Sequence, residues 1–187
     1  MDTVQYCGTE EIMGQVKWTT TNHTKSRSSS KEGDVYMWWD WKGVLYYELL
    51  AENQTINSNK YCSQLDQLKA ALNEKHPELV NRKHIIFHQD NTRPHVSLMT
   101  RPKPLQLGWE VLIHPPYSPD MALSDFPLFQ SLENSLNGKN FNSLEDCKRH
   151  LEQFFGQKDK KFWEDGIMKL PEKWQKVVEQ NGEHVVQ

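Results

Sequence analysis

Aromatic and apolar residues gather in two short runs in the first third of the chain. Residues 35–39 and 44–50 flank an Asp-Trp-Lys-Gly sequence, and its glycine is typical of a hairpin turn, so we expect two antiparallel strands. We interpret Asp40 as a residue of this turn in preference to a metal ligand. Apolar residues at three- and four-residue steps then predict a helix from its cap, Asn57, to about Asn73.

Later apolar patterns predict two more strands and several helices. Residues 84–88 and 109–113 are the strand candidates. In the C-terminal third, Ser143 begins a sequence that resembles a capping box, residues 162–168 suggest a short helix, and Pro171 suits the first turn of a last helix. The order strand, strand, helix, strand, helix, strand, helix predicts an α/β domain with a mixed sheet.

Two prolines interrupt the pattern between the later strands. A helix is expected from Pro94 to about Leu107, but Pro102 and Pro104 lie inside that range. An interior proline costs a helix about 3 kcal/mol, because it removes a hydrogen bond and clashes with the preceding turn. We therefore expect either that the helix stops near Thr100 or that the local fold is damaged.

Residues 1–34 differ from the rest of the chain. Their stretch 19–31 is polar, has few apolar residues and is typical of a flexible surface loop. Residues 11–18 are the one strand candidate ahead of it, and their periodicity is poor, so the first strand is expected to be degenerate. We place the main domain at residues 35–187.

Bulk composition limits the class of protein. The chain has 187 residues, of which 36% are hydrophobic, and this suits one globular domain. A net charge of −3 gives no global attraction to nucleic acid. The sequence has no signal peptide and no long apolar stretch, so we expect no secretion and no membrane partner. The cysteines are odd in number and form no Cys-x-x-Cys pair, which favours a reducing compartment; they are Cys7, Cys62 and Cys147.

The candidate chemistry lies in two aspartates. Asp90 follows the apolar run that ends at His88, and Asp125 lies at a Ser-Asp helix start. Residues 91–124, 34 in all, separate them. Two carboxylates at such positions suit hard, oxygen-seeking cations such as Mg²⁺ or Mn²⁺, and so metal-assisted phosphoryl transfer. Structural roles at a strand end and a helix cap are an equally good interpretation of the pair alone.

Four longer stretches resemble the catalytic domain of mariner transposases, in the Tc1/mariner superfamily. They are WWDWKGVLYYELL at 38–50, HQDNTRPH at 88–95, HPPYSPDMALSDFPLF at 114–129 and FWEDGIMKLPEKWQKVV at 162–178. The resemblance runs from about Val35 to the C-terminus. The 34-residue spacing between the two aspartates is also the one typical of the mariner branch.

This resemblance implies a ribonuclease H-like fold, with a mixed sheet flanked by helices, in which three acidic residues hold two Mg²⁺ or Mn²⁺ ions. Asp90 then corresponds to the second acidic ligand and Asp125 to the third. The first belongs to a Gly-Asp-Glu-Lys-Trp-like motif, whose best counterpart is residues 14–18, and this places Gln15 where the aspartate should be. A neutral amide cannot replace a bridging carboxylate, so we expect weakened metal binding and lost strand transfer.

The same resemblance implies DNA as the partner. Mariner transposases carry a helix-turn-helix region ahead of the catalytic domain, and we expect none here, so recognition of specific transposon ends is not expected. Weak, salt-sensitive DNA binding would come from Arg93, Arg101 and Lys103, with Arg82 and Lys83 nearby, although a solvated charged surface explains these residues equally well. The resemblance also allows a homodimer and implies localisation in the nucleus.

Several alternatives stay open. A zinc hydrolase site would use clustered histidines, but the family does not use these residues as ligands; they are His84, His88, His95 and His114. For function, the first hypothesis is a mariner-type catalytic domain, active or decayed. The second is a non-catalytic DNA-binding or dimerising module, as in fusions of a mariner domain to a SET methyltransferase. The third is the unselected product of a pseudogene.

Overall fold

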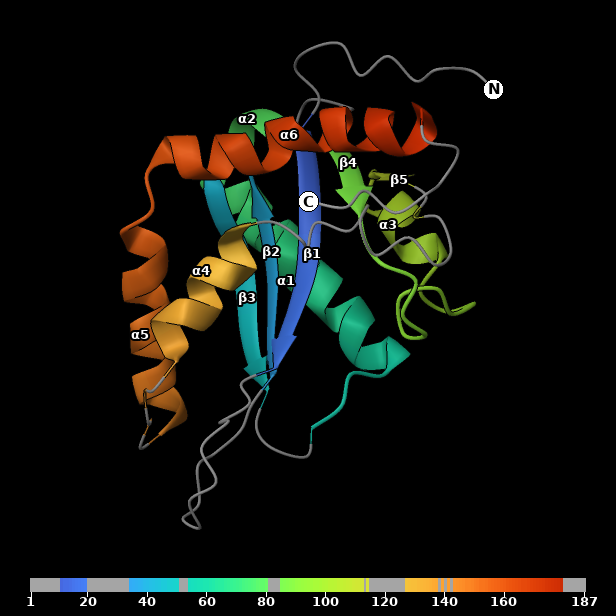
Figure 1. Ribbon diagram of the computed structural model, residues 1–187. Helices are drawn as coiled ribbons and strands as arrows, with labels where there is room; N and C mark the ends of the chain where they lie inside the picture. Colours follow the sequence, from blue (N-terminus) through green and yellow to red (C-terminus); the bar gives the residue numbers. More distant parts are fainter. Residues whose placement is uncertain are drawn as a thin grey trace.

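One five-stranded sheet runs through the middle of the domain, in the order β3-β2-β1-β4-β5 (Figure 1). The computed structural model describes residues 11–19, 34–50, 54–80, 85–112, 114, 127–137, 139, 141 and 143–179. The strands are β1 (Glu11–Thr19), β2 (Asp34–Asp40), β3 (Gly43–Leu50), β4 (Ile85–His88) and β5 (Glu110–Leu112). β2 is antiparallel to both β1 and β3, whereas β4 is parallel to β1 and β5 is parallel to β4. The prediction of a mixed sheet is confirmed.

The central strand is β1, which the sequence had placed outside the main domain. It pairs with β2 from Gly14 to Thr19 and with β4 from Glu11 to Gly14. The boundary drawn at residue 35 is therefore wrong for residues 11–19. Strict alternation of apolar and polar residues is typical of a strand with one face in water. A central strand that is covered on both faces does not need this alternation, which explains why the periodicity of residues 11–18 was poor.

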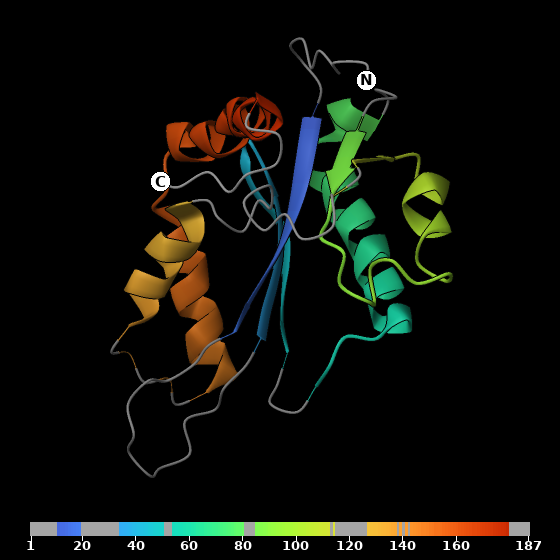
Figure 2. The same ribbon diagram turned by 45° about the vertical axis from the view of Figure 1, so that its right-hand side comes forward.

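Helices cover both faces of the sheet and create two separate hydrophobic cores (Figure 2). One face carries α1 (Ser58–Lys75), α2 (Pro77–Val80) and α3 (Pro102–Gln106), and the other carries α4 (Pro127–Leu136), α5 (Leu144–Gly156) and α6 (Lys160–Glu179). Successive residues of β2 alternate between them: Trp38 lies in the core under α1, and Met37 and Trp39 lie in the core under α4, α5 and α6. Both faces of the sheet are thus buried.

Local sequence signals explain the hairpin and the helix starts. Asp40 Oδ1 accepts hydrogen bonds from the backbone N–H groups of Lys42 (2.7 Å) and Gly43 (3.0 Å), so Asp40 is the turn residue that the sequence predicted. Gly43 has φ +140°, a conformation that favours glycine. Asn57 caps α1 by accepting from the Lys60 N–H, and Ser143 caps α5 by accepting from the Asp146 N–H. These predictions are confirmed.

Pro102 and Pro104 start a helix instead of breaking one. Residues 93–101 form consecutive turns, and α3 begins at Pro102. The prolines occupy the first and third positions of α3, where a backbone N–H has no acceptor within the helix, so neither removes a helical hydrogen bond. The prediction of a helix that begins at Pro94 is wrong. Among the described residues of this segment, the chain around the prolines forms a regular short helix, so the alternative prediction of a damaged local fold is not confirmed.

The last helix is longer than expected. The sequence predicted a break before Pro171, but α6 runs without interruption over Lys160–Glu179. Among the described residues, no helix has the length and apolar character that crossing a membrane requires.

Candidate metal-binding site

Asp90 lies just beyond the carboxyl ends of the parallel strands β4 and β5, next to β1, which continues to Thr19. Gly14 of β1 is paired with His88 of β4, and His88 is paired with Leu112 of β5. Asp90 follows two residues after His88, and Gln15 follows directly after the last β1–β4 pair. The carboxyl ends of parallel strands are where α/β sheets bind their ligands, so the topology brings these two positions to a suitable edge.

One carboxylate oxygen of Asp90 is fully engaged by its own loop. Oδ1 accepts from the Thr92 backbone N–H (3.0 Å) and from Thr92 Oγ1 (2.7 Å), and it lies 2.6 Å from His95 Nδ1. The two-residue step from Asp90 to Thr92 is a local turn of the kind that aspartate favours. Within the described residues no donor contacts Oδ2, and 45% of the Asp90 side chain is exposed. Oδ2 is therefore the oxygen available to a cation.

The surroundings keep Asp90 ionised. Partial burial by itself would raise the pKa of this carboxyl group, but the hydrogen bond and charge attraction of His95 and the two Thr92 hydrogen bonds outweigh it. The net effect holds the pKa of Asp90 far below its usual range. Asp90 is thus a permanent anion at neutral pH, as a ligand for a hard cation must be.

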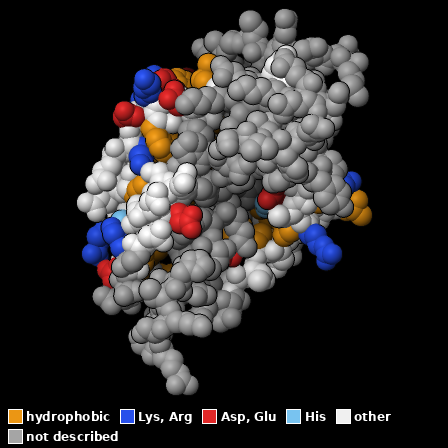
Figure 3. Space-filling view, viewed as in Figure 1, with side chains coloured by type: hydrophobic (Ala, Val, Ile, Leu, Met, Phe, Trp, Pro, Cys, Tyr) orange, Lys and Arg blue, Asp and Glu red, His pale blue; other side chains and the backbone are white. Residues whose placement is uncertain are grey.

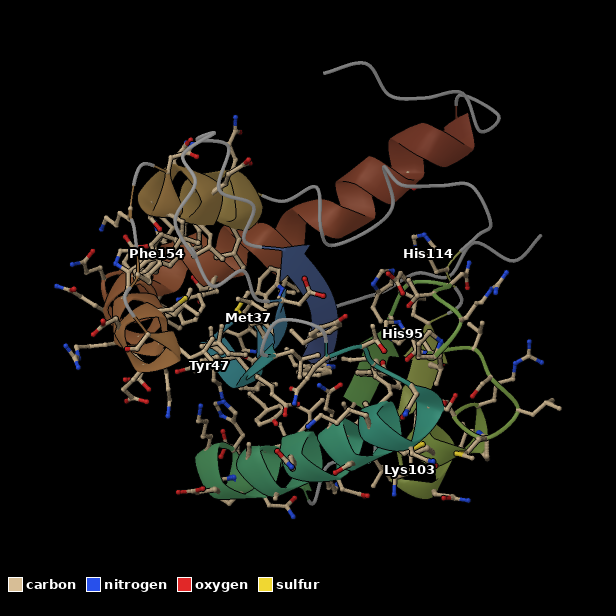
Figure 4. All side chains as sticks on the ribbon, turned by 90° about the horizontal axis from the view of Figure 1, so that it is seen from below. Met37, Tyr47, His95, Lys103, His114 and Phe154 are labelled. Atoms are coloured by element: carbon tan, nitrogen blue, oxygen red, sulfur yellow. The ribbon has the colours of Figure 1, made fainter. Side chains whose placement is uncertain are left out.

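A buried aromatic contact fixes His95. Its ring stacks on Tyr61 of α1, with ring centroids 4.1 Å apart, and both side chains are buried. Tyr61 donates its hydroxyl hydrogen to Gln89 Oε1 (2.6 Å), and Gln89 Nε2 donates to the His95 carbonyl (3.3 Å). Burial raises the pKa of Tyr61 well above its ordinary value, so its hydroxyl stays a donor. Figure 4 shows His95 and His114 on the same side of the domain.

His88 and His114 form a second pair beside Asp90. The His114 Nδ1 atom lies 3.4 Å from His88 Nε2, and the rings meet edge to face. Burial, with His114 adding to it, lowers the pKa of His88 to about 4, so its ring is neutral at pH 7. In the part of the chain that the structure describes, no three His, Cys, Asp or Glu side chains are grouped to hold a metal. His84, the fourth histidine of the zinc alternative, lies outside the described residues.

The other predicted site residues divide into three groups. Asp125, with Arg82 and Lys83, lies outside the described residues, and of Gln15 only the backbone is described. Arg93 and Arg101 are exposed and make no ion pair with any described residue. Lys103 is engaged instead, because its Nζ lies 2.6 Å from Asp66 Oδ1 on α1.

The one described ligand candidate, Asp90, fits Mg²⁺ or Mn²⁺. Asp90 offers an ionised, oriented and accessible oxygen, which is the ligand type that both ions prefer.

Sequence analysis found Asp90 but missed the residues that support it, Thr92, Gln89 and Tyr61. The threonine two residues after Asp90 was a local signal for one of them. Tyr61 could not be found that way, because it comes from another element 29 positions earlier (90 − 61).

Comparison with known proteins gives consistent relatives. Residues 15–82 match the family described as "Transposase (partial DDE domain)". The Mariner Mos1 transposase of Drosophila mauritiana is 40% identical over 166 residues, covering 88% of this chain and 48% of the relative. The human Histone-lysine N-methyltransferase SETMAR is 39% identical over 150 residues, covering 80% of this chain and 22% of the relative. The chain thus spans about half, or less, of the length of these two relatives.

Solved structures agree with the sequence relatives. The catalytic domain of Mos1 mariner transposase superposes with a TM-score of 0.85 at 38% identity, over 94% of this chain and 84% of that one. A structure of the same catalytic domain with Raltegravir and Mg gives a TM-score of 0.84 at 38% identity, over 94% of this chain and 85% of that one. A similarity of this extent confirms the α/β, ribonuclease H-like fold that the sequence predicted.

Proposed function

The chain belongs to the mariner transposase family, whose catalytic domain it matches, and from that premise we propose that it is a divalent-metal-dependent DNA-processing domain with reduced catalytic power. The observation that carries the proposal is Asp90, an ionised carboxylate at the carboxyl end of β4, with one oxygen that no described residue contacts as a donor. Its relatives include a Mos1 catalytic domain solved with Mg and one solved with Mn. Mg²⁺ or Mn²⁺ is the cofactor that we propose.

Each group has a defined part in this proposal. Bound divalent ions would activate the attacking oxygen and stabilise the leaving oxygen of a phosphodiester. Asp90 would hold an ion through Oδ2, and Asp125, by resemblance, would supply another carboxylate. His88, which is neutral at pH 7, adds no positive charge that would compete with a cation at this edge.

We propose DNA as the substrate, bound without sequence specificity by the residues beside Asp90. No acidic residue occurs from Asn91 to Trp109, and Arg93 and Arg101 in this segment are exposed. Figure 3 shows basic and hydrophobic side chains together at the right-hand edge of the molecule, where this segment lies in Figure 1. A Mos1 transposase paired-end complex with the left transposon end, among the similar structures, supports the choice of partner. Pairing of two copies and a nuclear location are further parts of the proposal.

The reduced activity follows from Gln15. An amide has no charge with which to bridge two cations, so a second ion would bind weakly and strand transfer would fail. This favours a second candidate, a non-catalytic DNA-binding module with an intact fold. The sheet pairing and the two cores support this candidate over an unselected chain, because they require consistent local and long-range signals.

Calorimetric titration with Mn²⁺ tests the proposal. Wild type should bind, Asp90→Ala should not, and Gln15→Asp should bind more tightly. Glu133→Ala is the control, because Glu133 is an exposed carboxylate on α4, on the opposite face. Absence of Mn²⁺ binding in wild type would contradict the metal site. Efficient Mn²⁺-dependent nicking of plasmid DNA by wild type, lost in Asp90→Ala, would contradict the reduced activity alone.

A further inference from the structure

We propose that His95 is a positioning residue, held by Tyr61 and Gln89, which orients the Asp90 carboxylate so that Oδ2 faces the cation. This inference rests on the proposed function and deepens it. It assigns to His95 an indirect task, through Asp90, and it links the proposed metal-binding edge to helix α1.

The orientation follows from how the donors divide between the two oxygens of Asp90. The Thr92 N–H, the Thr92 hydroxyl and the His95 ring all lie within 3.0 Å of Oδ1. The same hydroxyl is 2.7 Å from His95 Nδ1, so the two side chains close around one oxygen. Because Thr92 Oγ1 and His95 Nδ1 both donate to Oδ1, rotation of the carboxylate would break several hydrogen bonds at once. A carboxylate restrained in this way presents Oδ2 in a single direction.

His95 can hold Asp90 because it cannot move itself. The ring is only 5% exposed, and the Tyr61 ring lies flat against it, with an interplanar angle of 27°. The His95 carbonyl accepts from Gln89, and the His95 backbone N–H donates to the Thr92 carbonyl (2.9 Å). The ring and both backbone polar groups of His95 are therefore restrained.

Tyr61 anchors the whole arrangement in the core. It is fully buried and belongs to the same hydrophobic cluster as Trp38 and Leu65. Its hydroxyl fixes Gln89, which is the residue next to Asp90 in the chain. The core under α1 thus supports Asp90 both through the His95 ring and through the Gln89 side chain. Residues of this supporting kind typically change metal affinity by about 10- to 100-fold when they are replaced.

Two substitutions at His95 separate positioning from packing. His95→Phe keeps a ring on Tyr61 but has no donor, whereas His95→Asn places an amide N–H where Nδ1 was but loses the ring. We expect His95→Phe to bind Mn²⁺ about 10- to 100-fold more weakly in calorimetric titration. His95→Asn should recover most of the affinity, although its thermal unfolding midpoint should be lower than that of His95→Phe. His150→Phe on α5 is the control for replacing a partly buried histidine elsewhere.

The outcomes show whether His95 acts by positioning Asp90 or only by packing on Tyr61. Wild-type affinity in His95→Phe would overturn the inference and leave the proposed function standing, because a ring alone would then be sufficient. Equal weakening in His95→Phe and His95→Asn would overturn it as well, since the donor would not be the cause. Absence of Mn²⁺ binding in wild type would overturn the proposed function and this inference together.

Tyr61→Phe keeps the stacking on His95 but removes the hydroxyl, and it is a milder second test. We expect it to lower the Mn²⁺ affinity several-fold. An unchanged affinity would show that the Tyr61 hydroxyl does not support Asp90.

Discussion

The salt dependence of DNA binding should identify which basic residues contact phosphate. Arg93 and Arg101 are exposed and make no ion pair with the described residues, whereas Lys103 is held 2.6 Å from Asp66. Each phosphate contact contributes about 0.9 to the slope of log K against log salt concentration for duplex DNA. The double variant Arg93→Gln/Arg101→Gln should therefore lower the magnitude of that slope by about 1.8.

The corresponding change in affinity is large enough to measure. When the salt concentration rises from 50 to 200 mM, the affinity of the double variant should fall by a factor about tenfold smaller than the factor for wild type. Fluorescence anisotropy with a labelled duplex at four or more salt concentrations gives the slope directly. Lys103→Gln should change the slope by less than half as much as either arginine substitution, because Asp66 already neutralises the lysine.

A matched control removes the same charge elsewhere. Lys148→Gln/Lys161→Gln alters two exposed lysines, one on α5 and one on α6, on the opposite face of the sheet, and neither makes an ion pair with a described residue. The reasoning is refuted if this control lowers the slope as much as the arginine pair does, because binding would then follow net charge and not the surface beside Asp90. An unchanged slope in Arg93→Gln/Arg101→Gln would refute it as well.

Three further predictions concern stability and are checked by urea or acid unfolding. Asp40→Ala should cost about 2–4 kcal/mol, because it leaves two turn N–H groups without their acceptor, whereas Asp40→Asn keeps an acceptor and should cost clearly less; equal losses would point to the His76 contact instead. Leu132→Ala, at a fully buried position on α4, should cost about 2–5 kcal/mol, and a loss below 1 kcal/mol would contradict the packing. Asp90 has a pKa lower in the folded than in the unfolded chain, so its contribution is present above pH 4 and is lost as the pH falls below it. In the presence of a metal chelator, Asp90→Asn should therefore reduce the fall in the free energy of unfolding at acid pH. An unaltered pH dependence would show that the pKa of Asp90 is not lowered.

The sequence predicted best where the determinants are local. The Asp40 turn, the Asn57 cap and the strand around Ile86 depend on residues within a few positions of one another, and all three are present. Pro102 was misjudged for a related reason: its effect depends on its position in the helix, and the helix start was not marked by a side-chain cap. Local rules work only when the boundary to which they apply is known.

Of the described residues in the candidate site, the sequence predicted only the proposed metal ligand, Asp90. Asp90 is recognisable at the end of an apolar run, but the side chains that orient it come together through the tertiary fold. Tyr61 reaches His95 because α1 packs along the sheet, and no periodicity within α1 indicates this contact. The tyrosine fits the apolar stripe equally well as an ordinary core residue. A sequence pattern can show that a side chain is buried, but not which polar neighbour it will support.

Fold and chemistry are largely separable in this domain, and this bears on the proposed loss of one acidic ligand. The two cores are formed by apolar side chains such as Trp38, Trp39 and Leu132. A chain with glutamine at position 15 can therefore retain the architecture while metal binding weakens. Tyr61 is the exception, because it belongs to a core and also supports His95. Selection for stability alone would preserve Tyr61 as an aromatic residue, but only selection for an oriented Asp90 requires its hydroxyl and the His95 donor as well.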